Sequence, residues 1–424
     1  MSGLAASEVV PRPQLPRLLA GMRSEGRTVS LDEHLDAYGP PPTRQGVGLI
    51  DVVEASGLTG RGGAGFPTAT KMRAVAAQRG RKFVVANGTE GELLSSKDKA
   101  LLGFVPHLVL DGAALAAHAV GVHDVIVAVG QGAAHEHAAL AHALVERDRR
   151  GLDRVRFQIA AAPDGFVVGE ETALLSWLSG GPAKPTLVPP RPFERGLHGR
   201  PTLVQNVETL AHLALVARYG AAWFRELGTD AEPGSALVTL SGAVAEPGVY
   251  EVGLGMRVRD LVDWAGSATE PLGAYLVGGY FGSWIRSAKA ERTALLASEL
   301  APLGASLGAR TIFALPERVC GVAETARLAR YLADESAGQC GPCVHGLAAI
   351  ADGFERLARA ERADVPQIAR WLEQVRGRGA CRHPDGAVRL VESALEVFAD
   401  EVELHASGRC SGDGRVLLPT RMDR

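Results

Sequence analysis

Three of the five cysteines in this chain have the spacing of a metal-binding site. Cys340 and Cys343 flank a Gly-Pro dipeptide, and Cys381 follows one predicted helical hairpin later, in Gly-Ala-Cys-Arg-His-Pro. The Cys-x-x-Cys turn lets two thiolates reach one metal ion or cluster, while the third closes the site from another element. These residues indicate metal binding or electron transfer.

A glycine-rich loop in the first quarter of the chain has the pattern G-x-G-x-x-G, and it contains Gly60, Arg61, Gly62, Gly63 and Gly65. Glycines let backbone N–H groups approach a phosphate, the start of the following helix favours an anion, and Lys71 adds a positive charge. A dinucleotide-binding fingerprint requires a strand before the loop, whereas these preceding residues have a helical pattern. A tight turn between two helices is therefore the alternative to a phosphate site.

Acidic side chains gather at two predicted element ends. Asn87-Gly-Thr-Glu-Gly-Glu, which contains Glu90 and Glu92, directly follows an apolar strand. Glu170 and Glu171 begin a predicted helix, where the helix dipole favours negative charge. Strand ends in a parallel sheet are common ligand sites. The same carboxylates are also suited to capping helices or pairing with cations, and this second interpretation stays open.

The elements that must position these residues follow an alternating pattern, which indicates an α/β layer with a largely parallel sheet. Thr68 is the predicted cap of one helix. Strands are predicted at 83–86, 125–129 and 155–160, and helices at 46–54, 68–78, 100–120, 133–149, from 169 onward, 205–217, 322–334, 344–360, 366–375 and 388–405.

Length and composition fit a protein of two or three domains. The chain has 424 residues, of which 46% are apolar and 22% charged, and its net charge of −3 gives no basic field for nucleic acid. Pro106, His107, Asp111 and His118 interrupt the longest apolar run, so we expect no insertion into a membrane. The N-terminus lacks the basic start and apolar core of a secretory signal, which favours a cytoplasmic, reducing compartment.

Changes in pattern along the chain predict its organisation. Residues 235–287 show short alternating strands with Gly-Pro turns, and the residues after 319 are largely helical. The expected parts are an N-terminal arm at 1–40, an α/β domain at 41–230, a small β-rich domain at 235–287, a connecting segment at 288–319 and a helical bundle at 320–424.

Taken together and in this order, the segments resemble the flavin-binding subunit of respiratory complex I and of related NAD-linked hydrogenases and formate dehydrogenases. The resemblance runs from about Leu49 to Cys410. It implies a Rossmann-like FMN-binding α/β domain, a β-grasp insert of the soluble-ligand-binding type at 235–287, and a C-terminal four-helix bundle that carries the cysteine site.

The resemblance also implies roles for individual residues. A [4Fe–4S] cluster would use Cys340, Cys343 and Cys381, and Glu92, Glu170 and Glu171 would act at the flavin in catalysis. The residues that would bind FMN are Gly60, Arg61, Gly62, Gly63, Gly65, Lys71, Asn87, Glu90, Asn206 and Thr209.

The cysteine motif departs from the family pattern, because Ala337 replaces its first cysteine and alanine cannot bind iron. Four outcomes follow: a three-thiolate [4Fe–4S] cluster with another last ligand, a [3Fe–4S] cluster, recruitment of a further residue, or no cluster. The candidates for a further ligand are His345, His383, Cys320 and Cys410.

The nicotinamide side departs as well. Ala74 and Arg191 stand where the family has aromatic residues that stack on NADH, Phe166 replaces a tyrosine, and Thr89 replaces an aspartate. Phe66 remains as one aromatic platform. The loss of stacking surface is expected to weaken dinucleotide binding without abolishing it.

The sequence therefore predicts an FMN-dependent electron-transfer protein that accepts hydride from NAD(P)H and passes electrons through an iron–sulfur centre or to a ferredoxin. The resemblance adds a thioredoxin-like iron–sulfur subunit as a partner. One alternative keeps the flavin and does not use NAD(P)H. Another is a protein that binds a different phosphate ligand and has a structural zinc site at Cys340, Cys343, Cys381 and His383.

Overall fold

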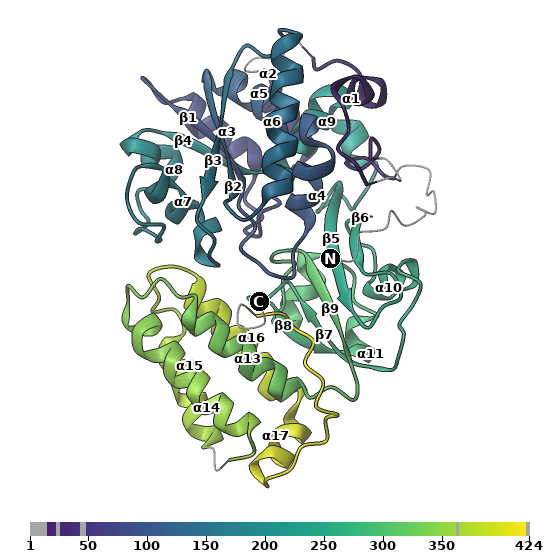
Figure 1. Ribbon diagram of the computed structural model, residues 1–424, viewed down its shortest axis with the longest axis vertical. Coiled ribbons are helices and arrows are strands. Elements are labelled where there is room, and N and C mark those ends of the chain that lie inside the picture. Colours follow the sequence, from purple (N-terminus) through teal and green to yellow (C-terminus); the bar gives the residue numbers. More distant parts are fainter. Residues whose placement is uncertain (1–14, 23–25, 43–47, 362–363, 421–424) are drawn as a thin grey trace.

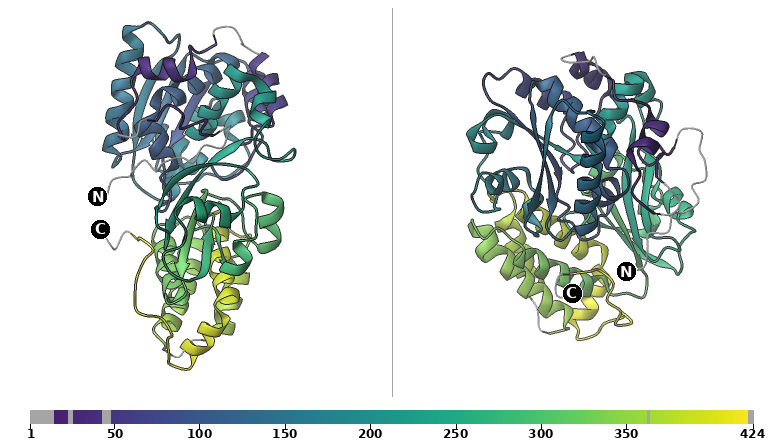
Figure 2. Two further views of the ribbon diagram at one scale, coloured as in Figure 1. Left: turned by 90° about the vertical axis from the view of Figure 1, so that its right-hand side faces the viewer. Right: turned by 45° about the horizontal axis from the view of Figure 1, so that its top comes forward.

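The computed structural model describes residues 15–22, 26–42, 48–361 and 364–420. Figures 1 and 2 show one lobe built on a first sheet, and a second lobe in which another sheet and the C-terminal helices lie side by side. Residues 1–14 and 23–25 of the expected N-terminal arm, and the first residues of the helix expected at 46–54, lie outside the described residues. The described part of the arm contains helix α1 (Leu31–Tyr38), which Ser30 and Glu33 begin with a capping box.

The first sheet is parallel and has the strand order β3-β2-β1-β4. Both faces of β1 are buried, because Val84 and Ala86 belong to one apolar core while Phe83 and Val85 belong to another. Such apolar runs are typical of a parallel strand covered on both faces. Its strands are β1 (Phe83–Gly88), β2 (Asp124–Gly130), β3 (Arg156–Ala162) and β4 (Thr202–Asn206).

The three predicted strands are confirmed, and β4 is a strand that the sequence pattern did not reveal. Gln205 and Asn206 were expected to open a helix, but they end β4, and helix α9 begins at Val207. The strand pairs with β1 in parallel register, with Ala86 opposite Gln205 and Asn87 opposite Asn206. The carboxyl ends of the two strands thus lie side by side, which is where ligands of open parallel sheets bind.

Helices α5, α6 and α9 cover one face of this sheet, and α7 covers the other. The first face includes a close helix contact, because a Cβ atom on Gly112 of α5 would lie only 1.8 Å from the carbonyl oxygen of Leu210 in α9. The helices of this lobe are α2 (Gly48–Ser56), α3 (Thr68–Ala76), α4 (Lys97–Phe104), α5 (Pro106–Val120), α6 (Ala134–Arg149), α7 (Glu171–Leu178), α8 (Pro192–Arg195) and α9 (Val207–Arg225), with short turns η1 (Val167–Gly169) and η2 (Leu197–Gly199).

Two further helix predictions in this lobe need correction. The single helix expected at 100–120 is two helices bent by 96°, because Pro106 has no N–H and begins α5 as a new helix. Thr68 is not a cap: Pro67 occupies that position, and no side chain caps α3 there. In the described chain no single helix is long and apolar enough to cross a membrane, and α4 and α5 meet that test only when the bent pair is joined.

The second sheet has the order β6-β5-β9-β7-β8, in which β5 and β9 are parallel and the other neighbours antiparallel. The expected connecting segment at 288–319 contains β9, so it supplies the central strand of this sheet. The elements are β5 (Ser235–Gly242), β6 (Gly248–Gly253), β7 (Leu272–Val277), β8 (Ser283–Arg286), β9 (Thr311–Pro316), α10 (Val258–Trp264), α11 (Ser287–Ala290), α12 (Ala297–Leu300) and η3 (Ala301–Leu303).

The C-terminal helices share an apolar core with the second sheet. Trp284 of β8 is buried in that core, and its indole N–H donates to the hydroxyl oxygen of Thr325 at 2.9 Å. The helix expected at 388–405 is interrupted at Phe398 and forms two helices. The elements are α13 (Gly321–Asp334), the π-helical turn η4 (Pro342–Leu347), α14 (Ala348–Ala358), α15 (Val365–Val375), α16 (His383–Val397) and α17 (Ala399–Ala406).

Candidate functional site

The glycine loop lies at the carboxyl ends of β1 and β4. A Cβ atom on Gly62 would lie 3.2 Å from Cβ of Asn206, the last residue of β4. The loop is closed by a hydrogen bond from the Gly60 N–H to the Phe66 carbonyl oxygen at 2.9 Å. Gly63 and Gly65 have φ values of 107° and 62°, which favour glycine, and both are exposed. The loop therefore exposes its backbone at this edge of the sheet, where the sequence predicts a phosphate site.

Arg61 points away from this open backbone. Its guanidinium is buried and donates to the carbonyl oxygens of Pro233 at 3.4 Å and Ser235 at 3.1 Å. Burial, with a contribution from Arg310, lowers the pKa of Arg61 to about 9. The backbone N–H of Arg61 donates to the hydroxyl oxygen of Thr209 at 2.8 Å. Thr209 thus holds the backbone of the loop, and the Arg61 side chain fastens the loop to the start of the second sheet.

Lys71 lies on α3, which follows the loop. Its Nζ atom is 2.9 Å from a carboxylate oxygen of Glu171 and 3.3 Å from the carbonyl oxygen of Val204. The neighbouring Gln205 is buried, and its side-chain Nε2 has no hydrogen-bond partner among the described residues. A buried amide donor without a partner is costly unless a further group satisfies it.

The segments that contain Asn87 and Gly169 are held together by backbone contact. The Asn87 side chain donates to the carbonyl oxygen of Gly169 at 2.9 Å. A Cβ atom on Gly169 would lie 2.8 Å from the carbonyl oxygen of Thr89, and one on Gly91 would lie 2.6 Å from that of Phe166. Glycine is needed at both positions because the two backbone segments approach so closely. The fold thus brings together the two acidic segments that the sequence singled out.

Glu90 and Glu170 each hold the start of a helix. Glu90 accepts from the N–H groups of Asp98 and Lys99, both at 3.2 Å, in the first turn of α4. Glu170 is the N-cap of α7 and accepts from the N–H groups of Thr172 at 3.0 Å and Ala173 at 2.9 Å. Their carboxylates therefore have the capping role that the sequence left open.

Glu92 connects the two sheets. Its carboxylate accepts from the N–H groups of Tyr280 at 2.7 Å and Leu94 at 3.2 Å. Burial raises the pKa of Glu92 to about 7, although these two hydrogen bonds oppose the shift. These contacts place Glu92 at the interface between the two lobes, and its role at the flavin stays a prediction.

A buried charge network beside the loop was missed by sequence reasoning. The Lys97 ammonium lies 2.7 Å from Asp98 and 3.0 Å from Glu208, and Asn206 donates to Asp98 at 2.7 Å. Burial alone would raise the pKa of Glu208, but the charge of Lys97 holds it below its ordinary value. Arg310 completes the network with a hydrogen bond to the backbone oxygen of Arg61. The only sequence signal was a run of charges in a mostly apolar helix.

The cysteine motif comes together as predicted. The sulfur atoms of Cys340 and Cys343 are 3.8 Å apart. Cys381 is close enough to contribute to the raised pKa of Cys343, and Cys340 contributes to the raised pKa of Cys381. Burial raises the pKa of Cys343 to about 11 and, with a contribution from Glu170, also raises the pKa of Cys381. Ala337 is buried, and its place as the position of a missing thiolate stays a prediction.

This cysteine site adjoins the acidic edge of the first sheet. The Phe166 N–H, just before α7, donates to the Glu335 carboxylate at 2.8 Å, and Glu335 immediately follows α13. The Phe166 ring packs edge-on against Phe281 and His383. The cysteine loops are therefore fastened to the segment that begins α7.

The four candidates for a further cluster ligand lie in different surroundings. His383 Nε2 is 2.6 Å from the carbonyl oxygen of Leu332, so that nitrogen carries a proton and only Nδ1 is available to a metal. His345 is exposed. Cys320 caps the opposite end of α13, whose 14 residues span about 21 Å, and Cys410 lies beside Cys320.

The residues on the expected nicotinamide side lie in different surroundings. Ala74 and Phe66 are half-buried, and Arg191 is exposed. Thr89 donates to the side-chain oxygen of Asn87 at 2.6 Å. The Phe166 ring packs against Phe281 and His383, so it lies at the junction between the lobes.

Family models match three parts of this chain. Residues 53–215 match the Nuo51 FMN-binding domain, residues 237–276 match the SLBB domain, and residues 323–405 match the NADH-ubiquinone oxidoreductase-F iron-sulfur binding region. These matches define the class of protein: a flavin-binding α/β domain joined to an SLBB domain and an iron–sulfur region.

Relatives agree over nearly the whole length. The F-type subunit of NADH-quinone oxidoreductase from Mycobacterium tuberculosis (strain ATCC 25618 / H37Rv) is 32% identical over an alignment of 388 residues that covers 85% of this chain and 85% of that protein. An F-type subunit of the same enzyme from Rhizobium meliloti is 30% identical, over 92% of this chain and 95% of that protein. A chain of the NAD+-reducing [NiFe]-hydrogenase in the H2-reduced state superposes with a TM-score of 0.80 at 32% identity, over 92% of this chain and 68% of the other. The chain belongs to the family of F-type NADH-quinone oxidoreductase subunits.

Proposed function

We propose that this chain is an FMN-dependent oxidoreductase that accepts hydride from NAD(P)H and passes electrons onward through an iron–sulfur centre. The observation that carries the proposal is the junction of three features. The open glycine loop and the start of α7 lie at one edge of the first sheet, linked by the pair Lys71–Glu171, and the cysteine loops are fastened to the same segment through Phe166 and Glu335.

The residues present fit the phosphate end of FMN. Gly62, Gly63 and Gly65 expose backbone at the start of α3, where N–H groups and the helix dipole favour an anion. Lys71 supplies a positive charge, and the buried Gln205 amide supplies a donor without a partner among the described residues. Bound FMN would supply the conversion between two-electron hydride transfer and single-electron steps.

The carboxylates divide into supporting and tuning roles. Glu90 and Glu170 fix the helix starts that shape the site, and Glu92 fixes the second sheet against it. We propose that Glu171 and Glu170 adjust the flavin potential, because their charges lie at the same edge as Lys71. Asn87 and Asn206 orient this edge through their hydrogen bonds to Gly169 and Asp98.

Cys340, Cys343 and Cys381 fit an iron–sulfur cluster by ligand type, with helices α13 to α16 as the four-helix bundle that carries them. The acceptor would be another subunit, either thioredoxin-like with its own iron–sulfur centre or a ferredoxin. The names of the relatives support work within a multi-subunit assembly. The cytoplasmic location that the sequence favours stays a prediction.

A second candidate function keeps the flavin but takes electrons from a reduced ferredoxin. It is favoured by Ala74 and the exposed Arg191, which stand at the positions of expected stacking aromatics. The two functions share a flavin site and differ only in the donor.

The test is an anaerobic purification followed by measurement of flavin, iron and sulfide and by visible spectra with NADH or NADPH. We expect bound FMN that bleaches on mixing with one of the two nucleotides. A bound flavin that neither nucleotide reduces would overturn nicotinamide use, and reduction by ferredoxin would then support the second candidate.

A matched pair of glycine variants tests the flavin site itself. Gly65 and Gly80 both have positive φ, 62° and 81°, and a Cβ atom on either meets nothing within 4 Å. We expect Gly65→Val to lower FMN affinity by at least about tenfold, since one lost charge-assisted hydrogen bond already has that effect. Gly80→Val carries the same backbone strain outside the loop and should keep its FMN. Equal retention by both variants would contradict the assignment.

A further inference from the structure

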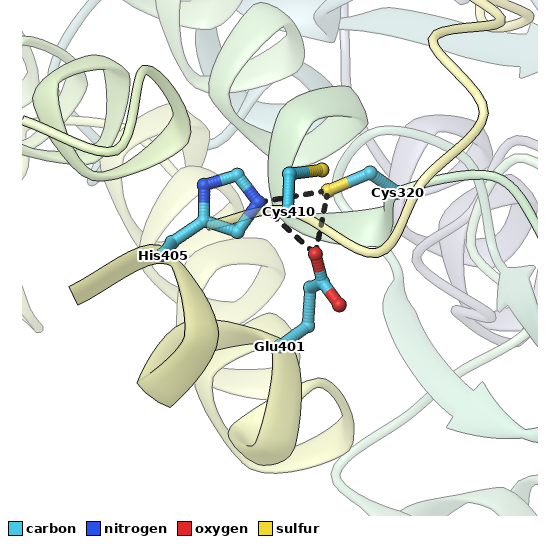
Figure 3. A group of neighbouring side chains, drawn as sticks. All are labelled: Cys320, Glu401, His405 and Cys410. Carbon is cyan, nitrogen blue, oxygen red and sulfur yellow. Dashed lines mark hydrogen bonds and ion pairs between the residues drawn. The ribbon is translucent and has the colours of Figure 1, made fainter. Parts of the chain in front are cut away.

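A second group of metal-binding side chains lies outside the flavin and cysteine-motif site. Cys320, Glu401, His405 and Cys410 each offer one donor atom, and these atoms all lie within 4.8 Å of one another. Figure 3 shows the side chains pointing toward one another from three segments. Cys320 caps the start of α13, Glu401 and His405 lie one turn apart on α17, and Cys410 belongs to the segment that follows α17.

The donor atoms have the spacing of a tetrahedral zinc site. The Cys320 sulfur is 3.3 Å from Nε2 of His405 and 3.8 Å from Oε1 of Glu401, and these two atoms are 3.1 Å apart. Zn–S bonds of about 2.3 Å and Zn–N or Zn–O bonds of about 2.0–2.2 Å place tetrahedral donors roughly 3.4–3.8 Å apart. Small movements would complete the geometry.

The imidazole is already oriented for a metal. His405 is 1% exposed, and its Nδ1 atom lies 3.0 Å from the carbonyl oxygen of Leu357. That hydrogen bond places the proton on Nδ1 and leaves the lone pair of Nε2 directed at the other three donors. A backbone carbonyl on the far nitrogen is the usual partner of a metal-bound histidine.

The other donors are held in a similar way. Ser411 N–H donates to Oε1 of Glu401 at 2.9 Å. The Ala323 N–H donates to the Cys320 sulfur and the Gly412 N–H to the Cys410 sulfur, each at 3.3 Å. Hydrogen bonds from backbone N–H groups stabilise thiolates, which are the forms that bind metal.

We propose that Cys320, Glu401, His405 and Cys410 bind one Zn²⁺ ion in a structural site. Two thiolates, one imidazole and one carboxylate are ligands that zinc accepts, whereas Ca²⁺ and Mg²⁺ prefer oxygen ligands throughout. Since Cys410 is exposed and the other donors are not, an ion can enter from that side. Binding displaces the thiol protons to solvent and involves no redox change.

The ion would fasten the C-terminal segment onto α13. Beyond Cys410 the chain returns along this helix, where the N–H groups of Leu417 and Leu418 donate to Glu324 at 2.7 and 3.1 Å. The Leu418 side chain is buried in the core shared with the second sheet. A metal that joins Cys320 to Cys410 would close this return.

The test measures zinc, iron and FMN per chain in the full-length protein, purified under reducing conditions and dialysed against a weak chelator. We expect one tightly bound zinc. Glu401→Gln, His405→Gln and Cys410→Ser should each weaken zinc binding by at least about tenfold, with iron and FMN unchanged. Glu403→Gln is the matched control, because Glu403 lies on α17 but is exposed outside the group.

X-ray absorption at the zinc edge gives a second measurement that needs no variant. The site predicts two sulfur ligands at about 2.3 Å and two nitrogen or oxygen ligands at about 2.0–2.2 Å, which are the usual bond lengths to zinc in proteins. Three or four sulfur ligands, or zinc lost only from Cys340→Ser, would overturn the proposal by moving the ion to the other cysteine site. Zinc retained by all variants would show an adventitious ion only. A Cys320–Cys410 disulfide in zinc-free protein would also overturn it.

Discussion

The two ends of α13 carry two different thiol sites. After its last residue the chain forms the motif turn with Cys340 and Cys343, which meets Cys381 and lies next to the flavin edge. At its other end, the N-cap residue Cys320 meets Glu401, His405 and Cys410. The first site has thiolates only, whereas the second mixes sulfur, nitrogen and oxygen. Thiolate sets suit iron–sulfur clusters, and mixed sets of this kind suit zinc.

The two sites differ in how they could be recognised. The motif site is visible along the chain because two of its ligands come from one turn. The mixed site joins residues 320, 401, 405 and 410, and its spacing has no motif apart from Glu401 and His405 at i, i+4. One site depends on local sequence, and the other depends on the packing of α17 and the segment after it against the start of α13.

The largest effect on metal content should come from Cys340→Ser. Removal of one of three thiolates from the motif site should lower cluster iron to less than about a tenth, because each thiolate is a direct ligand. Zinc at the other end of α13 should not change. Iron and zinc analysis of Cys340→Ser beside Cys410→Ser measures both, and the comparison fails if either variant removes both metals.

A smaller effect is expected when the missing thiolate is restored. Ala337→Cys should raise the iron that survives dialysis against a chelator from about three to about four atoms per chain, because a full [4Fe–4S] cluster has a thiolate on every iron. Iron and sulfide analysis with a cluster spectrum checks this. Ala337→Ser, similar in size, is the control. No difference between the variants would mean that position 337 does not face the cluster.

Glu92→Gln is expected to leave the metal content unchanged. Its effect is on the pH dependence of the free energy of unfolding. Burial raises the pKa of Glu92 from 4.5 to about 7, so the folded protein binds this proton more tightly than the unfolded chain. The stabilisation is complete below about pH 4.5 and is lost as the pH rises through 7, by about 1.4 kcal/mol per pKa unit.

Denaturant unfolding between about pH 5 and 8 measures this dependence, because this range includes the raised pKa of Glu92 in the folded protein. Glu92→Gln should remove this pH dependence, with about the same FMN, iron and zinc. Glu54→Gln on α2 is the control, because its side chain is exposed. A parallel pH dependence in Glu92→Gln would show that another group is responsible.

Several features could be predicted from the sequence and others could not. Strands β1, β2 and β3 were visible because their apolar runs are continuous. β4 was missed because it is short and leads directly into α9, and β9 because its partners β5 and β7 lie far away in the chain. The glycine loop was recognised, but the direction of Arg61 was not, since it depends on Pro233 and Ser235 of another lobe.

Local sequence was enough to establish the family, the alternation of strands and helices, and the cysteine turn. These features depend on neighbouring residues and on apolar side chains that recur about every two to four residues. Tertiary packing decided which carboxylates cap helices, which residue joins the two lobes, and which side chains meet at the start of α13. Those outcomes depend on contacts between distant segments, such as Glu92 with Tyr280 and Cys320 with His405. Packing brings such residues together, and no local pattern records it.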